Sequence, residues 1–581
     1  MNRSILSFCV GLSALAGLVA SLQAQTYEQV APKTPAPPPA KSPSEPDADA
    51  GATPAAADDR VILPALRGIV FVTSTNEFHR DGVSVEGVQV GGDPKLQTPA
   101  FHSLAAAYLG RPLSRSSLDR LTRDVVLYFR RHGRPVVDVL VPEQNISTGT
   151  VQILVIEGRL GAVRSEGNNW FSAELLKKYV RARPGEIIEG GPLLADLAWI
   201  NQNPFRQVDL VFSRGTEPGE TDIILRTRDR FPLRVYTGYE DSGNALTGFD
   251  RVLAGVNWGN AFGLDQQMNY QLSASPDFKK MVAQSGSYIV PIPSLRDTFT
   301  VFGSYAESRP DLSGGAFDLK GLAWQVSARY RLPLPVEGTE TRDLTVGVDF
   351  KRSNNNLSFG GTQVFAQDND VVQATAAASF SRPDKYGITA GELTVAASPG
   401  GVTSNDSSEA YLAARAYAKP DYAYARLDLE RTTKLPAKFS WVTRGSAQLA
   451  SANLLGSEQL GLGGSDNLRG YEEREANGDN GFVLVDELHG PPLQVARLFG
   501  RGLQDDRLDP LVFIDYGVVG SHKLLPGEPN YLELASSGLG IRYNFGNNFS
   551  LRADYGWQLK QSGVSDLRRT SRGYLSAVLS Y

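Results

Sequence analysis

The second half of the chain is built from short segments in which apolar and polar residues alternate. From about residue 232 onward these segments are roughly 10 residues long, with turn-forming residues between them. The last runs from Gly573 to Tyr581 and ends on an aromatic residue. Repeated alternating segments of this length are typical of a transmembrane β-barrel, because every second side chain faces lipid. The pattern predicts sixteen strands, roughly at 233–240, 249–259, 264–275, 281–292, 298–308, 320–333, 343–354, 370–381, 386–398, 421–434, 438–452, 481–490, 509–520, 532–545, 548–560 and 571–581.

Bulk composition hides this membrane character. The mean hydropathy is -0.23 and hydrophobic residues make up 41% of the chain, close to an ordinary globular protein. After residue 22 no stretch holds 18 consecutive apolar residues, so a mature transmembrane helix is not expected. The 58 glycines and 22 tyrosines suit the turns and aromatic girdles of a barrel. The net charge of -5 argues against a nucleic-acid partner.

Residues 1–24 read as a secretory signal segment, with Arg3 before an apolar run and Ala24 at a plausible cleavage site. A retained membrane anchor is the alternative. The only cysteine, Cys9, lies in this segment, so disulfides, thiolate metal sites and cysteine catalysis are excluded from the mature chain. Residues 25–60 are rich in Pro, Ala and charged residues, which predicts an extended or disordered linker.

Two α/β domains are predicted between the linker and the barrel. Residues 61–158 contain strands at 68–72, 85–90, 134–141 and 150–156, with helices at 98–109 and from Ser114 to Gly133. Residues 159–230 repeat this plan, with strands at 160–164, 207–213 and 221–227 and helices at 173–180 and 193–201. The barrel domain then covers residues 231–581.

Three motifs stand out against this organisation. The first is Trp199-Ile200-Asn201-Gln202-Asn203-Pro204-Phe205-Arg206-Gln207-Val208, followed by Gly219-Glu220-Thr221-Asp222-Ile223. The second is Leu468-Arg469-Gly470-Tyr471, in a Gly-rich interval of about 28 residues between predicted strands, which is too long for a simple turn. The third is Phe513-Ile514-Asp515-Tyr516-Gly517 on a late strand.

With the motifs in this order, the chain resembles the outer-membrane transporters of bacterial two-partner secretion, which export hemolysins and filamentous hemagglutinin-like adhesins and belong to the BamA-like superfamily. The resemblance covers nearly the whole mature chain. It implies a mainly β fold, a 16-stranded transmembrane β-barrel preceded by two α/β POTRA domains. The first motif resembles the signature of the second POTRA domain, at Asn201, Asn203, Pro204 and Arg206. The second and third resemble the superfamily's loop and barrel motifs, with Leu468 where Val is usual.

The resemblance also implies how two of the motifs meet. In the family the loop folds into the barrel lumen and its arginine binds an aspartate of the wall, which assigns Arg469 to Asp515. A guanidinium and an inward carboxylate make a bidentate, charge-assisted contact. Phe513, Asp515 and Gly517 share one strand face, and Gly517 is expected to let the loop backbone approach closely. Many family members also have an amino-terminal plug helix, but here only Tyr27–Val30 could begin one, which puts the plug in doubt.

Residue sets that carry catalysis or bind metals are not found. The five histidines show no metal-ligand spacing, and neither a nucleophile elbow nor a phosphate-binding loop is present. The pair Asp505-Asp506 is assigned to a surface turn and Glu472-Glu473 to the long loop. We therefore expect a chain that is not an enzyme and takes neither cofactor nor metal.

The leading functional hypothesis is a translocator in the bacterial outer membrane, with its POTRA domains in the periplasm. Its partners would be outer-membrane lipid and a secreted adhesin- or hemolysin-like protein in extended form, captured on exposed sheet edges. The alternative is an outer-membrane protein insertase of the same superfamily. Insertases commonly carry more POTRA domains, and a passive porin or barrel enzyme would not account for 170 or so periplasmic residues.

Overall fold

The computed structural model describes residues 30–34, 60–217, 219–310, 317–334, 340–359, 362–496, 506–563 and 569–581. The chain divides into two compact units. One contains residues 35–232 and the other contains residues 1–34 with residues 233–581. The predicted signal segment and most of the predicted linker fall in residues 1–29 and 35–59, outside the described residues.

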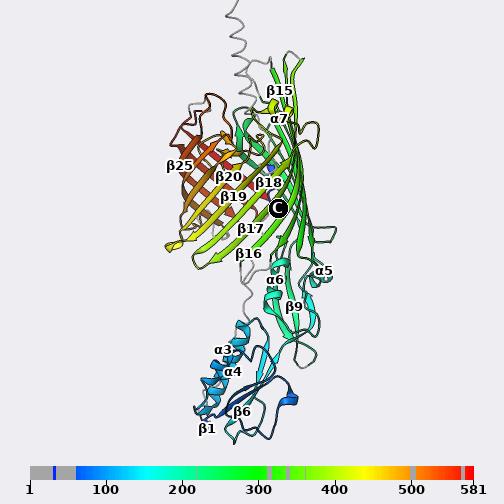
Figure 1. The fold of residues 1–581 in the computed structure, drawn as a ribbon, viewed down its shortest axis with the longest axis vertical. Coiled ribbons are helices and arrows are strands. Elements are labelled where there is room, and N and C mark those ends of the chain that lie inside the picture. Colours follow the sequence, from blue (N-terminus) through cyan, green and yellow to red (C-terminus); the bar gives the residue numbers. More distant parts are fainter. Residues whose placement is uncertain are drawn as a thin grey trace, which may run out of the picture. The chain divides into compact units, whose positions relative to one another are not determined.

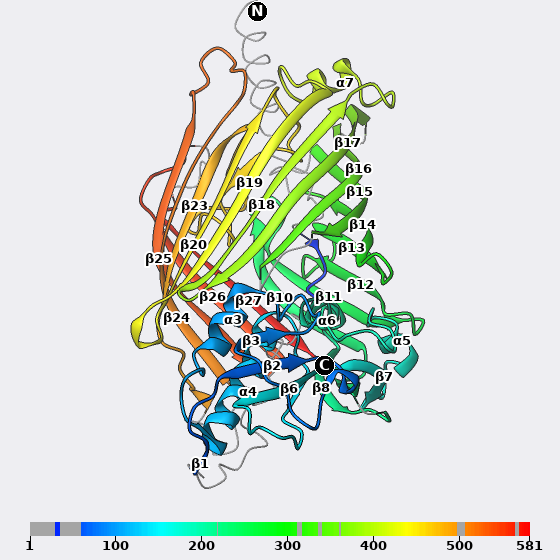
Figure 2. The ribbon, with the colours of Figure 1, turned by 60° about the horizontal axis from the view of Figure 1, so that its bottom comes forward.

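Residues 233–581 form a closed antiparallel barrel in which β27 pairs back onto β10 (Figures 1 and 2). The predicted count of sixteen strands is confirmed. The barrel strands are β10 (Leu233–Asn244), β11 (Gly248–Ala261), β12 (Gln266–Ala274), β13 (Met281–Ile292), β14 (Asp297–Ser308), β15 (Phe317–Pro333), β16 (Thr341–Phe359), β17 (Thr362–Asp384), β18 (Gly387–Pro399), β19 (Asp421–Lys434), β20 (Ser440–Ala450), β23 (Asn480–His489), β24 (Asp506–Gly520), β25 (Leu532–Phe545), β26 (Phe549–Gln558) and β27 (Ser571–Ser580).

Two neighbouring strands, β16 and β17, run well past their predicted ends, and β15 starts at Phe317, slightly earlier than predicted. β15, β16 and β17 contain 17, 19 and 23 residues and stay paired along their added length. The added part of β16 includes Asn355 and Asn356, where the apolar alternation is interrupted. Alternation reports only the part of a strand that faces lipid, so a polar extension carries no such pattern.

The prediction of a surface turn at Asp506 was wrong. Asp506 is the buried first residue of β24, and its carboxylate accepts hydrogen bonds from the amides of Val495 and Ala496.

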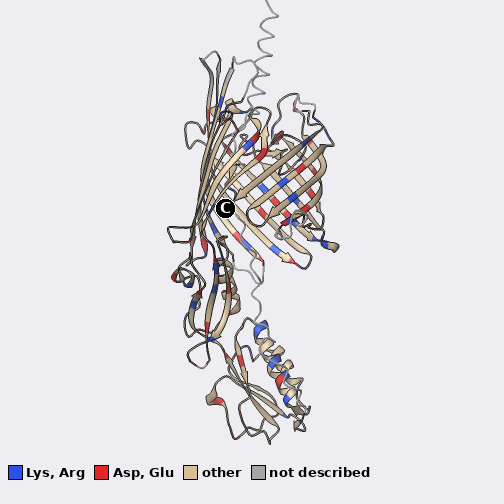
Figure 3. Cartoon of the chain, turned by 180° about the vertical axis from the view of Figure 1, so that it is seen from behind, with Lys and Arg blue, Asp and Glu red and all other residues tan. Residues whose placement is uncertain are grey.

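The barrel wall is apolar outside and polar inside. On β12, Met268 and Tyr270 are exposed, whereas Asn269 and Gln271 are buried. Asn269 bonds to Ser287 and Asn257 across the neighbouring strands, so the inward row is a ladder of polar side chains. Figure 3 shows acidic and basic residues interspersed along the barrel strands. This inversion of the usual burial suits a barrel whose outer face contacts lipid.

The unit of residues 35–232 holds two α/β modules. The first has a four-stranded sheet in the order β3-β2-β6-β5, with α3 and α4 packed on it through Phe101, Leu121, Val125 and Phe129. Its elements are β1 (Val61–Leu63), β2 (Gly68–Val72), η1 (Thr75–Glu77), β3 (Gly87–Val90), α3 (Pro99–Ala106), β4 (Leu113–Ser114), α4 (Arg115–Arg131), β5 (Val137–Leu140) and β6 (Thr150–Glu157). Ser114 caps α4 reciprocally with Ser117, as its position before an amphipathic run predicts.

The second module has a three-stranded sheet in the order β7-β9-β8. Its elements are β7 (Arg159–Glu166), α5 (Ala173–Lys177), α6 (Gly190–Ile200), β8 (Arg206–Arg214) and β9 (Glu220–Asp229). Leu160, Leu197, Ile200 and Ile223 form its core. Among the described residues, no helix has both the length and the apolar character needed to cross a bilayer.

The barrel connections differ at its two ends. We call the end where β10 starts the proximal end, and the other the distal end. The connections at 400–420 and 451–479 both lie at the distal end because strands alternate in direction. The first contains α7 (Ser408–Ala414), capped by Ser407, and the second contains the short strands β21 (Leu460–Leu462) and β22 (Ala476–Gly478). A short 3₁₀ helix, η2 (Pro436–Lys438), lies at the proximal end.

Candidate functional site

The connection of residues 451–479, called the lumen loop below, folds against the inner wall of the barrel. Its apolar side chains Leu460, Leu462, Leu468 and Tyr471 are buried. They pack on inward residues of β23, β24 and β25, namely Val483, Val485, Val519 and Leu534. The loop thus covers a patch of the wall that would otherwise expose apolar side chains inside the lumen.

Arg469 occupies the centre of this contact, and its side chain is only 1% exposed. Its Nε and Nη2 donate to the two carboxylate oxygens of Asp515, at 2.9 and 2.7 Å, and its backbone N–H donates to the same group at 3.0 Å. Its Nη1 lies 2.5 Å from Glu487 and 3.7 Å from Asp554. The guanidinium carbon lies 3.5 Å from the centre of the Phe513 ring. The loop and strand motifs therefore lie together, at the pair of residues to which the resemblance assigns the contact.

Further arginines share the carboxylates around Arg469. Arg542 and Arg552 both donate to Asp554, at 2.8 and 2.7 Å, and Arg444 donates to Glu487 at 3.1 Å. A buried charge is tolerated only when it is paired and hydrogen-bonded. Sequence reasoning missed Glu487 and Asp554. Their inward positions on predicted strands were a usable signal, but only barrel closure brings β23, β24 and β26 around one loop residue.

Gly470 and Gly556 allow the loop backbone to touch the wall. Gly470 has φ +99, in the left-handed region that favours glycine. A Cβ on Gly556 would lie 2.7 Å from both the Arg469 carbonyl carbon and the Gly470 nitrogen. At Gly517 the close neighbours are instead the side chains of Leu468 and Leu462, at 2.7 and 2.9 Å. The expectation of a backbone approach at Gly517 was therefore wrong, and Gly556 serves that purpose.

Tyr471 extends the contact to the last strands. Its hydroxyl lies 2.7 Å from the Ala535 carbonyl oxygen and also contacts the Lys560 carbonyl oxygen. The Tyr574 hydroxyl donates to the Tyr471 carbonyl oxygen. The four residues of the loop motif thus each contact the wall, through an apolar side chain, an ion pair, a backbone approach and a hydroxyl.

Two buried carboxylates fix the base of the lumen loop. Glu458 is 1% exposed and bonds to Lys351 at 2.9 Å, Gln373 at 3.1 Å and Tyr424 at 3.1 Å. Asp479 is fully buried and binds Arg415 from the connection that contains α7, at 2.6 and 3.1 Å. The amides of Leu454 and His522 also donate to Asp479.

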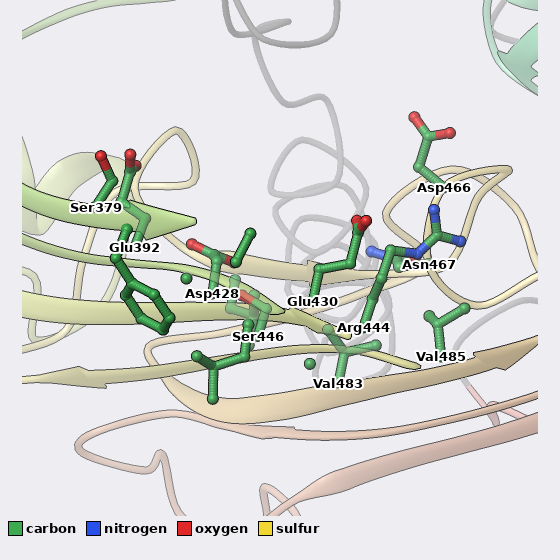
Figure 4. A pocket seen from close by; sticks show the side chains of 16 residues that line it. Ser379, Glu392, Asp428, Glu430, Arg444, Ser446, Asp466, Asn467, Val483 and Val485 are labelled. Atoms are coloured by element: carbon green, nitrogen blue, oxygen red, sulfur yellow. The ribbon is translucent and has the colours of Figure 1, made fainter. Parts of the chain in front are cut away.

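A pocket of about 490 Å³ remains beside the loop in the lumen (Figure 4). Residues of β17–β20 and β23 line it, together with Leu460, Asp466 and Asn467 of the lumen loop. Its carboxylates, Glu392, Asp428 and Glu430, come from neighbouring strands (Figure 4). The pocket is open and does not enclose a ligand.

The described part of the amino-terminal segment also lies inside the barrel. Val30 packs on Met281 and Ala283 of β13, and its carbonyl oxygen accepts from Gln271 and Ser285. The Lys33 amide donates to Tyr236 at 2.9 Å, and its ammonium lies 2.8 Å from Glu240. Of the four residues expected to begin a helix, only Val30 falls within the described residues.

The motif assigned to the second POTRA domain shapes the turn between α6 and β8. Asn201 exchanges two hydrogen bonds with the backbone of Val208, at 2.7 and 2.9 Å. Asn203 accepts from the Phe205 amide at 3.0 Å, and the Pro204 carbonyl oxygen accepts from Arg230 at 3.2 Å. Arg206 is 2% exposed, and its Nε donates to the Ile200 carbonyl oxygen at 2.8 Å. These side chains are buried within the module, where they position β8.

Comparison with known proteins places this arrangement in a family. Residues 219–543 match the family of haemolysin secretion/activation proteins ShlB/FhaC/HecB, and residues 83–158 match the ShlB-type POTRA domain. The heme/hemopexin transporter protein HuxB of Haemophilus influenzae is 23% identical over 459 residues, which cover 76% of this chain and 78% of HuxB. The outer membrane transporter CdiB of Escherichia coli is 24% identical over 449 residues, 74% of each chain.

Solved structures agree on the fold. CdiB from Escherichia coli superposes with a TM-score of 0.68 at 18% identity, covering 91% of this chain and 92% of that one. The family match alone spans more than half of the chain. The chain belongs to the ShlB/FhaC/HecB family of haemolysin secretion/activation proteins, and it is an outer-membrane transporter of two-partner secretion.

Proposed function

We propose that this transporter exports a secreted, adhesin- or hemolysin-like partner that reaches the barrel in extended form, and that the lumen loop controls the pore. The barrel lies in the outer membrane and the POTRA region in the periplasm, so the proximal end of the barrel faces the periplasm. The observation that carries the proposal is Arg469, buried among Asp515, Glu487 and Asp554. These contacts hold an irregular loop inside a closed barrel, where it obstructs the path that a polypeptide must take.

Capture of the partner fits the free sheet edges of the two α/β modules. Among the described residues β5 and β8 each pair with a single strand, and they pack beside α4 and α6 respectively. An extended peptide can add to such an edge through main-chain hydrogen bonds while its side chains enter the groove beside the helix. Leu140 at the end of β5 is 49% exposed and offers an apolar contact there. Backbone recognition of this kind requires an unfolded partner.

Export is proposed to proceed without catalysis by this chain. The carboxylates and arginines of the lumen pair with one another and hold the loop, which leaves them a positioning role. Folding of the partner at the cell surface would then drive transport. The insertase alternative gains no support from the comparisons, because these relatives are named as transporters.

The test is co-expression of this transporter with a candidate secreted partner, whose amount in the culture medium is measured. We expect Arg469→Ala to abolish secretion while the barrel still inserts, as seen by its heat-dependent shift on gels. Arg331→Ala is the matched control, because Arg331 pairs with Asp343 on a wall strand at 43% exposure and does not contact the loop. Normal secretion by Arg469→Ala would overturn the role of the loop.

A further inference from the structure

Two aromatic side chains stand exposed on the second α/β module. Trp170 precedes α5 and Phe231 follows β9, and they are 49% and 55% exposed. Their ring centroids lie 4.9 Å apart at an interplanar angle of 74°, an edge-to-face pair. Both belong to the unit of residues 35–232. Together they make an exposed apolar surface on the module.

The turn that carries Trp170 is held firmly. The Asp229 carboxylate accepts the backbone N–H groups of Asn169, Trp170 and Phe171, at 3.0, 2.7 and 3.0 Å. The next ring, Phe171, is buried beneath the Arg206 guanidinium at 4.6 Å. The indole is therefore presented by a fixed backbone, which lowers the entropic cost of inserting it into a partner.

Chain connectivity sets where this pair lies. Phe231 is two residues before Leu233, the first residue of β10, so their Cα atoms are at most about 7 Å apart. Leu233 and Val235 are exposed on the barrel's outer face, while the neighbouring Arg234 bonds inward to Asn257. Phe231 therefore directly precedes, along the chain, the strand whose outward side chains face lipid.

We propose that Trp170 and Phe231 insert into the periplasmic leaflet of the outer membrane and anchor the second α/β module to its phospholipid surface. Tryptophan and other aromatic rings favour the boundary between headgroups and acyl chains, where an apolar ring and a polar N–H are both satisfied. The proposal depends on membrane location and not on export.

The test uses the full chain in phosphatidylcholine vesicles and the fluorescence difference between the wild type and Trp170→Phe. This difference isolates Trp170 from the other five tryptophans. Lipids carrying bromine near the headgroup end of the acyl chains are expected to quench it more strongly than lipids brominated near the bilayer centre. Trp199→Phe is the control, because Trp199 is 6% exposed and lies in the core of the same module. We expect neither brominated lipid to quench the fluorescence difference between the wild type and this variant.

Two more variants separate the anchor from accidental quenching. Phe231→Ala removes half of the apolar surface and Asp229→Ala frees the turn, so each is expected to reduce the lipid quenching of Trp170. The proposal is overturned if the Trp170 signal has the emission wavelength of a water-exposed indole and responds to neither brominated lipid. A signal insensitive to lipid that shifts to shorter wavelength when the secreted partner is added would assign the pair to the cargo, and would also overturn it.

Discussion

Arg415 and Asp479 form a bidentate ion pair that joins the connection containing α7 to the base of the lumen loop. Arg415 also donates to the Leu454 carbonyl oxygen at 2.7 Å and to the Ser521 hydroxyl at 3.1 Å. Three distal connections of the barrel therefore meet at one buried carboxylate. Since strand direction places them at the extracellular end, this cluster holds the exit side of the pore in one arrangement.

Substitution of Asp479 by Ala is expected to loosen that exit. It removes the acceptor for Arg415 and for the amides of Leu454 and His522, and breaking a buried ion pair costs about 3–5 kcal/mol. In planar lipid bilayers we expect longer and more frequent open events than in the wild type.

Arg507→Ala is the control for this measurement. Arg507 pairs with Asp509 near the periplasmic end of β24, but its side chain is 65% exposed, and exposed pairs contribute little. Unchanged gating in Asp479→Ala would show that the ion pair does not restrain the loops.

Replacement of Arg469 by Lys tests whether geometry or charge holds the loop. A lysine keeps the positive charge but cannot make the two parallel bonds to Asp515 while also reaching Glu487. We therefore expect secretion well below that of the wild type, measured as partner in the medium. Full secretion by Arg469→Lys would mean that charge alone suffices.

The alternation of apolar and polar residues predicted strand bounds best in strands that face lipid. The bounds of β13, β19 and β25 equal the predicted ranges. Prediction was weakest at the distal connections, where α7 was not expected although Ser407 is a good helix cap. Nothing local to Arg415 indicates that it binds Asp479, 64 residues later, because that pairing exists only once the barrel has closed.

The candidate site was predictable only in part, for the same reason. The resemblance paired Arg469 with Asp515, and the two side chains do lie together. The close backbone contact was assigned to Gly517 because it shares a motif with Asp515, but it occurs at Gly556 two strands away. A motif records residues that are near in sequence, whereas a loop inside a barrel touches strands from several parts of the chain.

Substitution of Gly556 by Ala tests that backbone contact. A methyl group there would lie 2.7 Å from backbone atoms of Arg469 and Gly470, which cannot move without displacing the ion pair. We expect reduced secretion and faster protease cleavage within the loop. Gly573→Ala on the next strand is the control, since its nearest neighbour would be a Tyr555 ring carbon at 3.5 Å, an ordinary contact. Equal behaviour of the two variants would contradict the proposed tight contact.

Asn201→Ala is expected to destabilise the edge strand β8 without touching the barrel. The Asn201 amide satisfies both the N–H and the carbonyl oxygen of Val208, and leaving a buried group unsatisfied costs about 1–3 kcal/mol. Hydrogen exchange should speed up over Arg206–Arg214, and secretion should fall if that edge receives the partner. The neighbouring Gln202→Ala is the control, because Gln202 is exposed and one residue away. Faster exchange at β8 with normal secretion would show that the order of β8 is not needed to capture the partner. The binding edge would then be sought at β5.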